Sequence, residues 1–202
     1  MPRRTDHSRE ELYDLALAAA RDIIREDGLS ALTARRVAHA IGYSPGTLYN
    51  VFDDLDDLIV HMNGRTLDAL YDDLMQVAKT DDPARDLKAL LAGYLAFLDG
   101  NRNLWGVLFE HRLSGDAALP DWYLQKIDQV LGLIETTLAR RLPDLDRDNL
   151  KDAARILWAS LHGICSLSGS GKLQIVSDQT VHAMAETLMT RFVAGLEQTR
   201  VT

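Results

Sequence analysis

Four aspartates stand within five residues of this sequence, and carboxylate oxygens so close together could hold a metal ion. Asp53, Asp54, Asp56 and Asp57 form the run, within the segment GYSPGTLYNVFDDLDDLI. The run contains no histidine and lacks the ligand spacing of a calcium-binding loop, whereas carboxylates also stabilise the first turn of a helix. We therefore expect helix capping here, and we predict no metal or other cofactor.

The segment GSGK, residues 169–172, invites comparison with a phosphate-binding loop. Ser166 stands where that motif requires its first glycine, and Leu173 stands where it requires serine or threonine. The preceding residues have helical periodicity, whereas the motif follows a strand. We interpret the segment as a connection between two helices.

His162 and Cys165 are the other residues that could carry catalysis. No partner lies at a diagnostic spacing from His162. Cys165 is the single cysteine, which excludes an internal disulfide, and a lone thiol is more often a small core residue than a nucleophile. The sequence favours a protein that is not an enzyme; catalysis by His162 in a helical cavity is the alternative.

Helices must position all of these residues, because helical periodicity dominates and no persuasive strand pattern occurs. We predict an all-α fold of about nine helices. The first begins at Ser8, which forms a capping box with Glu11, and ends before Gly28. The later helices are expected near residues 33–41, 44–52, 54–78, 82–99, 104–109, 121–142, 146–167 and 177–196.

Composition places the chain among soluble globular proteins. Of its 202 residues, 47% are hydrophobic and 26% are charged, and no apolar run approaches the roughly 18 residues of a membrane span. The first residues are charged where a signal peptide would be apolar, so we expect a cytoplasmic protein without membrane contact. The net charge of -8 argues against coating nucleic acid by bulk charge, although residues 1–50 balance seven arginines with seven acids.

Residues 33–52 have the proportions of a helix-turn-helix, whose second helix lies in the major groove of DNA. Thr33 is expected to cap a short helix that stops at Gly42, and Ser44 to cap the next helix, with Pro45 at its first position. The residues left facing outward are candidates for DNA contact: Tyr43, Pro45, Gly46, Thr47, Tyr49 and Asn50.

The segment LTARRVAHAIGYSPGTLYNVFDDLDDLI, residues 32–59, resembles the DNA-binding signature of the TetR family of transcriptional regulators. The matching residues are Thr33, Arg35, Val37, Ala38, Gly42, Ser44, Gly46, Leu48, Tyr49, Phe52 and Leu58. The resemblance implies a DNA-binding domain over residues 1–52 and a helical effector-binding and dimerisation domain over residues 53–202. Its implied DNA contacts are Thr33, Arg35, Tyr43, Thr47 and Tyr49, and Ser44 belongs to the same predicted surface. The chain departs from the pattern at Leu55, where many members have a lysine that touches a phosphate.

A second resemblance lies in LWASLHGICSLSGSG, which is similar to the Trp-x-x-x-His-Gly element of one TetR subgroup. Trp158 and His162 are four residues apart and so share one helix face, with Cys165 beside them. The resemblance implies that this face is a wall of the effector pocket. Trp105 and Phe109 are expected first in the core and are added as candidate ligand contacts.

These patterns predict a ligand-responsive transcriptional regulator that acts as a homodimer on a palindromic double-stranded DNA operator. By the resemblance it is a repressor, released from the operator by a small-molecule effector. The helix expected at 177–196 carries two apolar rows: one has Val181, Met184, Ala185, Leu188 and Phe192, and the other has Met189, Val193 and Leu196. One core cannot easily use both rows, so the excess is expected at a subunit interface. The alternative outside enzymes is a structural DNA-binding protein without an effector.

Overall fold

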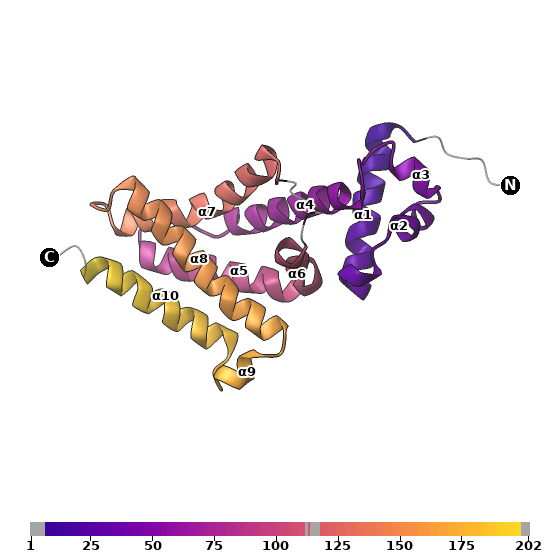
Figure 1. Cartoon of the computed structure of the whole chain (residues 1–202). Coiled ribbons are helices and arrows are strands. Elements are labelled where there is room, and N and C mark those ends of the chain that lie inside the picture. Colours follow the sequence, from indigo (N-terminus) through magenta and orange to yellow (C-terminus); the bar gives the residue numbers. More distant parts are fainter. Residues whose placement is uncertain (1–6, 112, 114–117, 199–202) are drawn as a thin grey trace. The chain divides into compact units, whose positions relative to one another are not determined.

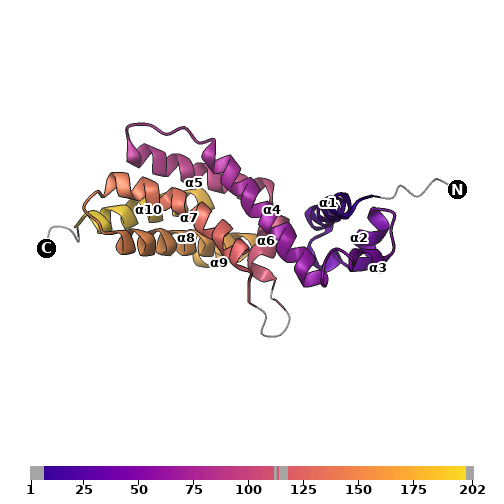
Figure 2. The same cartoon turned by 90° about the horizontal axis from the view of Figure 1, so that it is seen from above.

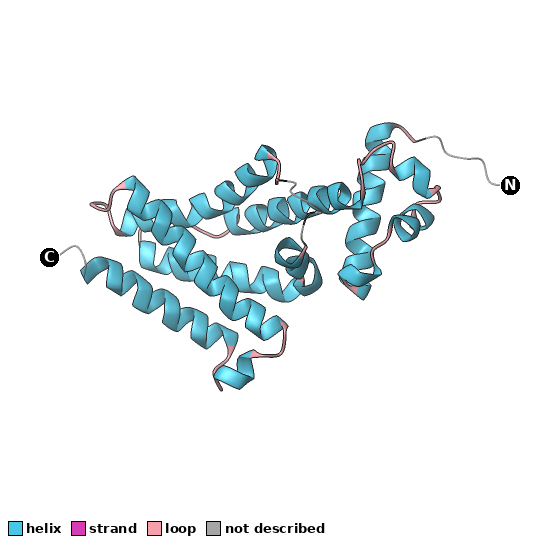
Figure 3. Cartoon of the chain, in the orientation of Figure 1, coloured by secondary structure: helices cyan, strands magenta, loops and turns pink. Residues whose placement is uncertain are grey.

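Every regular element in the described part of the chain is a helix, as Figure 3 shows. The computed structural model describes residues 7–111, 113 and 118–198. It confirms the predicted all-α fold. None of the described helices has the length and apolar character needed to cross a membrane.

Ten α-helices and one short 3-10 helix follow one another along the described chain (Figure 1). Their bounds are α1 Arg9–Asp27, η1 Leu29–Ala31, α2 Ala34–Ala40, α3 Pro45–Leu48, α4 Leu55–Met75, α5 Pro83–Gly100, α6 Arg102–Glu110, α7 Asp121–Arg141, α8 Arg147–Gly169, α9 Leu173–Val176 and α10 Val181–Gln198.

These helices form two compact units. Unit 1 comprises the described residues up to Thr66 together with those of Asn101–Tyr123, and unit 2 comprises Leu67–Gly100 and the described residues from Leu124 onward. Helices α4 and α7 therefore contribute residues to both units. Each unit is described below by itself.

Unit 1 is built around the apolar face of α1. Helices α2 and α6 pack against α1, and α3 packs against α2; Figures 1 and 2 both show α1, α2 and α3 side by side. Leu104 and Val107 of α6 lie in the same core as residues of α1 to α4. The start of α1 is the predicted capping box: Ser8 Oγ accepts a hydrogen bond from the Glu11 amide, and Glu11 accepts one from the Ser8 amide.

The run of aspartates begins α4 and satisfies backbone amides there. The Asp54 carboxylate accepts a hydrogen bond from the Asp57 amide at 2.8 Å, and the Asp57 carboxylate accepts one from the Asp53 amide at 3.1 Å. The carboxylates of Asp54 and Asp57 therefore cap the start of α4, which is the role predicted for this run. Leu55, in the same turn, packs partly buried against the core of unit 1 and supplies no cation.

In unit 2, α10 packs along both α8 and α5. The buried carboxylate of Asp86, at the start of α5, accepts hydrogen bonds from the amide and hydroxyl of Thr80 and pairs with Arg140 of α7 at 2.6 Å. Arg140 also donates to the Thr80 carbonyl. These contacts hold the connection that precedes α5 against α7.

Several boundaries differ from the sequence-based expectation, and one short helix was not predicted. Helix α10 begins at Val181, four residues after the predicted Ser177. Helix α3 ends at Leu48, and turns continue the chain to Phe52. Helix α4 ends at Met75, three residues before the predicted Ala78. The predicted connection after α8 contains the additional short helix α9, whose Leu173 is buried. A helix of four residues is too short to show a periodic apolar pattern, so the sequence could not indicate α9.

Candidate functional site

Gly42 and Tyr43 form the turn between α2 and α3. Gly42 has φ = 78°, a left-handed conformation that favours glycine. The Tyr43 amide donates a hydrogen bond to the Ala38 carbonyl at 2.8 Å, which closes the turn. Leu48, only 2% exposed, anchors α3 in the core of unit 1. These two ends hold α3 in place and determine which of its residues face solvent.

Most of the residues predicted to contact DNA belong to this turn, to α3 and to the two residues after α3, whereas Thr33 and Arg35 belong to the start of α2. The side chain of Tyr49 is 51% exposed although it is large and aromatic. Pro45, Gly46 and Asn50 are also exposed. A Cβ at Gly46 would meet only Ser44 Oγ, at 3.9 Å, so packing within the chain does not require glycine there.

Three hydroxyl groups of this surface also have structural roles. Thr33 caps α2 as predicted, because its Oγ1 accepts a hydrogen bond from the Arg36 amide at 3.1 Å. Ser44 occupies the N-cap position of α3, but its Oγ pairs with Thr47 Oγ1 at 3.0 Å and makes no side-chain cap. Each hydroxyl keeps acceptor capacity for a further partner.

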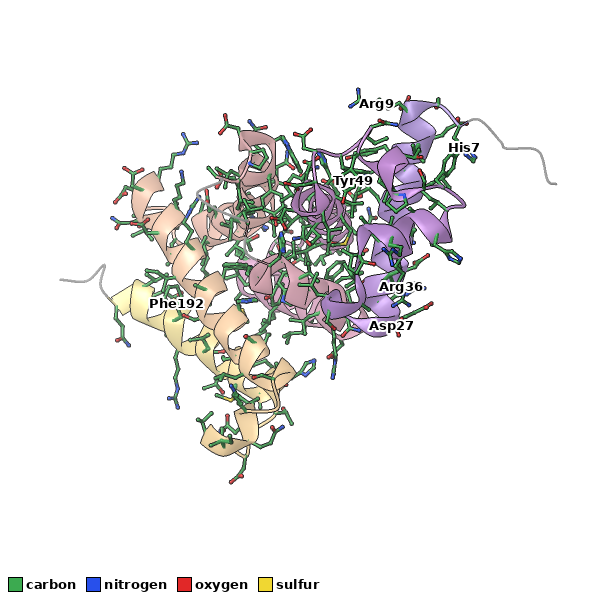
Figure 4. The ribbon with its side chains drawn as sticks, turned by 45° about the vertical axis from the view of Figure 1, so that its right-hand side comes forward. His7, Arg9, Asp27, Arg36, Tyr49 and Phe192 are labelled. Atoms are coloured by element: carbon green, nitrogen blue, oxygen red, sulfur yellow. The ribbon has the colours of Figure 1, made fainter. Side chains whose placement is uncertain are left out.

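Arg35 and Arg36 are neighbours in the sequence but differ in their contacts. Arg36 pairs with Asp27 at the end of α1, and Figure 4 labels both residues. Arg35 is exposed, and among the described residues it makes no ion pair. Arg35 is therefore the arginine whose charge is available to a phosphate group.

His7, which the sequence did not indicate, holds the phenol of Tyr43. Its amide donates to Tyr43 Oη at 3.3 Å, and its ring Nδ1 lies 2.8 Å from the same oxygen. His7 directly precedes the N-cap of α1 (Figure 4), so this contact joins the start of α1 to the helix-turn-helix. The two residues are 36 positions apart, and no local pattern relates them.

Unit 2 contains a cavity with an empty volume of about 510 Å³, part of which opens to solvent. Helices α4, α5, α7, α8 and α10 all contribute to its walls. Ten of its twelve lining residues are aliphatic, and the other two are aromatic: Leu74, Leu87, Leu90, Leu91, Tyr94, Val130, Leu133, Ile134, Leu157, Trp158, Leu161 and Met189. Mostly apolar walls are typical of ligand pockets.

Trp158 is the predicted ligand-contact residue that lines this cavity. The ring of His162 stacks on Trp158, with centroids 5.4 Å apart, and Cys165 is buried one turn further along α8. Burial lowers the pKa of His162, which favours the neutral imidazole, and burial followed by the charge of Asp99 raises the pKa of Cys165 to about 11. Neither residue lines the cavity itself.

Trp105 and Phe109 lie elsewhere. Both belong to α6 in unit 1, where their rings pack with centroids 5.2 Å apart, whereas unit 2 builds the cavity. The prediction that they touch a ligand gains no support from this cavity. Sequence reasoning missed the leucine walls because an apolar row that lines a cavity has the same spacing as one that fills a core.

The described residues contain no cluster of three or more histidine, cysteine, aspartate or glutamate side chains arranged to hold a metal ion. Around the aspartates of α4, Asp57 lies 3.4 Å from His61, and Asp56 lies 3.3 Å from His111. Each of these two contacts joins one aspartate to one histidine. They occur in addition to the amide contacts that cap α4.

A helix-turn-helix with exposed contact residues, followed by a helical unit with an apolar cavity, defines a class of helical DNA-binding regulators. Residues 16–62 match the sequence profile of the bacterial regulatory proteins of the tetR family, and residues 87–192 match that of the tetracyclin repressor-like C-terminal domain. The second match alone covers more than half of the chain. The chain belongs to the TetR family of transcriptional regulators.

Several solved structures share this fold. A protein of unknown function from Rhodococcus sp. RHA1 has a TM-score of 0.73 at 20% identity, covering 96% of this chain and 98% of that one. The fatty acid degradation regulator FadR from Bacillus halodurans has a TM-score of 0.65 at 18% identity, covering 90% and 94%. FadR from Bacillus subtilis, in complex with stearoyl-CoA, has a TM-score of 0.62 at 18% identity, covering 91% and 98%. Among proteins with curated descriptions, none matches the chain.

Proposed function

We propose that this regulator is a homodimeric repressor that binds a palindromic operator and leaves it when a small molecule enters the unit 2 cavity. Residues 1–52 are the DNA-binding domain, and residues 53–202 bind the effector and form the dimer. The exposed surface of the helix-turn-helix carries this proposal. Its contact residues are Thr33, Arg35, Tyr43, Ser44, Pro45, Gly46, Thr47, Tyr49 and Asn50.

The exposure of Tyr49 is the single observation that supports DNA binding best. Tyr49 is 51% exposed, so about half of the surface of this large aromatic residue stays in solvent in the free protein. In the major groove, the same ring would contact base edges and sugars. Binding to DNA therefore accounts for the exposure of the Tyr49 side chain. Arg35 adds a cation for a phosphate on the same surface.

Operator binding is tested by enriching a pool of random DNA duplexes with the wild-type protein and measuring affinities by fluorescence anisotropy. The enriched sequence is expected to be a palindrome with half-sites about 34 Å, one helical turn, apart. Tyr49→Ala is expected to lose this binding while the dimer persists. Thr190→Ala, at an exposed position of α10, is the matched control. Wild-type affinity in Tyr49→Ala would refute the assignment of this surface.

The dimer is assigned to α8. Between Ile156 and Leu167, every exposed residue of this helix is uncharged, and Ile156 itself is 55% exposed. Ala159 and Gly163 are small, so a second helix could approach closely. An apolar stripe of this kind is self-complementary across a twofold axis. Both apolar rows of α10 are partly used within the chain, because Ala185 of one row and Met189 of the other are buried.

Release by a small molecule rests on the cavity and on the relative from Bacillus subtilis that holds stearoyl-CoA. Leu74 lines the cavity and belongs to α4, the helix that begins in unit 1. A ligand that shifts Leu74 acts on the backbone of α4. If ligand and operator prefer different positions of this helix, each weakens the binding of the other.

Two measurements separate this proposal from its alternatives. A cavity ligand should raise the melting temperature of the protein and lower its operator affinity, and an effector-free DNA-binding protein would show neither change. An enzyme would convert its ligand, whereas a regulator returns it unchanged after denaturation. Chemical conversion that His162→Ala abolishes would support the enzyme instead.

A further inference from the structure

We propose that the unit 2 cavity selects an uncharged, mostly hydrocarbon ligand and excludes molecules that must bring a charged group inside. This inference rests on the proposed effector site and specifies the chemistry of its ligand. It follows from the composition of the walls, the state of the polar groups near them and the pairing of the nearby charges.

The walls offer dispersion contacts and no counter-ion. Aspartate, glutamate, lysine, arginine and histidine are all missing from the residues that line this cavity. A hydrocarbon gains free energy by leaving water for such a site, whereas a buried ion that has no partner loses its hydration without compensation.

The groups beside Trp158 are uncharged at neutral pH. Burial raises the pKa of the Tyr94 phenol far above its ordinary value and raises that of the Cys165 thiol to about 11. Burial lowers the pKa of His162, which leaves the imidazole neutral. None of these three groups therefore supplies a charge that could balance a carboxylate, phosphate or ammonium group on the ligand.

Two ionised side chains close to wall residues of the cavity are already paired, Asp86 on α5 and Arg155 on α8. Asp86 directly precedes the wall residue Leu87, and its carboxylate is held by Thr80 and Arg140. Arg155 of α8 pairs with Asp128 at 2.7 Å and with Glu135 at 3.0 Å. Recruiting any of these charges to a ligand would break an existing ion pair, which makes a charged ligand still less favourable.

Three probes with one hydrocarbon chain and different head groups test the inference: 1-decanol, decanoate and decylammonium. The full-length protein is titrated with each at neutral pH, without DNA, and binding is followed by melting temperature and tryptophan fluorescence. Trp158 is the tryptophan of unit 2, since Trp105 and Trp122 belong to unit 1. Decanol is expected to bind, and both charged probes to bind at least about tenfold more weakly. Decanoate should bind more tightly as the pH is lowered and its carboxyl group becomes protonated.

Two substitutions of one wall residue test whether the probes bind inside the cavity. One fills the cavity with a larger side chain, and the other adds a charge to its wall. Leu133→Trp, at a half-buried wall position, should weaken decanol binding, and Leu124→Trp, at an exposed position of the same helix, should not. Leu133→Arg should reverse the preference and admit decanoate. The wild-type probe series decides the question even if either variant fails to fold.

Equal binding of decanol and either charged probe would overturn the inference, as would the absence of binding by all three. The proposed function is tested separately, because the probe series needs no DNA. A protein that binds decanol but enriches no DNA sequence keeps this ligand selectivity and loses the repressor assignment. A protein that binds an operator but prefers decanoate keeps the repressor assignment and loses the selectivity.

Discussion

Tyr43 is fixed at both its backbone and its side chain, which matters for a residue expected to touch DNA. The backbone is tied to Ala38, and the phenol oxygen is tied to two nitrogens of His7. A side chain already held in one orientation loses less conformational entropy on binding. His7 is therefore a positioning residue for the DNA-binding surface, although it lies outside the helix-turn-helix.

Replacing His7 should weaken operator binding without unfolding the protein. His7→Ala removes one side-chain hydrogen bond, so we expect a loss of about 1 kcal/mol, roughly fivefold in affinity. Fluorescence anisotropy with the enriched operator measures it, and His182→Ala, at an exposed position of α10, is the control. His7→Asn, which keeps a hydrogen-bonding side chain of similar reach, should restore part of the loss. Equal affinity of His7→Ala and wild type would show that Tyr43 needs no support.

Arg35 and Arg36 should differ in how their loss affects the salt dependence of DNA binding. Arg35→Ala is expected to weaken binding to all sequences and to reduce the slope of log K against log salt by about one ion, since it removes a phosphate contact. Arg36→Ala should keep the slope, because Arg36 is engaged with Asp27. Titrations at several salt concentrations distinguish the two. Identical slopes for both variants would contradict the assignment.

The connection between α4 and α5 depends on one ionised carboxylate. Hydrogen bonds from Thr80, followed by the pairing with Arg140, lower the pKa of Asp86. A carboxyl group whose pKa is lower in the folded state stabilises the fold above its unfolded value, about 3.9, and this contribution is lost as the pH falls through the folded value. The helices of unit 2 should therefore loosen in acid.

Asp86→Asn should lower the melting temperature at neutral pH by several degrees, because it leaves Arg140 without its partner. The variant should also lose less stability than the wild type between neutral pH and about pH 3, since it lacks the carboxyl group that becomes protonated. Thermal melts followed by circular dichroism across this range test both expectations. The matched control is Asp81→Asn, an exposed aspartate of the same connection. Parallel curves for wild type and Asp86→Asn would refute the role of this carboxylate.

The sequence predicted elements well where the signal was local. Ser8 with Glu11, Thr33, and the aspartates before α4 all cap helices as expected, since the capping groups lie within four residues of the amides that they satisfy. Contacts between distant residues were not predictable. The His7 contact with Tyr43, the Asp86 pair with Arg140 and the position of α6 against α1 all depend on tertiary packing.

The two candidate sites also differ in how far local sequence patterns predicted them. The DNA-contact residues of the helix-turn-helix stay a prediction, made residue by residue because their spacing is a recognisable signature. The cavity was predicted only through Trp158, since Leu133 or Met189 has the same pattern whether it fills a core or lines a space. The α8 stripe was missed because that helix looked apolar nearly all round, and only the structure separates its buried face from its exposed one.

At the scale of the whole molecule, the dimer should depend on α8. Ile156→Glu is expected to give a monomer, because a twofold interface would bury two copies of the new charge. The monomer should bind the operator at least about a hundredfold more weakly, since the half-sites are no longer bound by linked domains. Size-exclusion chromatography with light scattering measures the assembly, and Gln129→Glu, at an exposed position of α7, is the control.

Truncation before α10 is a poorer test of the dimer. It would remove Ala185 and Met189, which are buried, and with them one wall of the cavity. If Ile156→Glu still formed a dimer, the assignment of the interface to α8 would be wrong. The interface would then be assigned to α10, on which Figure 4 labels Phe192.

Helix α8 has two faces with different freedom to change during evolution. Leu157, Trp158 and Leu161 face the cavity, whereas Ile156, Ala159 and Gly163 are exposed. In the proposed dimer, a substitution on the exposed face would meet its own copy across the twofold axis, so most changes there would be penalised twice. A substitution on the cavity face would act once in each subunit. On this proposal, descendants of the protein would acquire new effectors through single changes in the cavity while their subunits continue to pair.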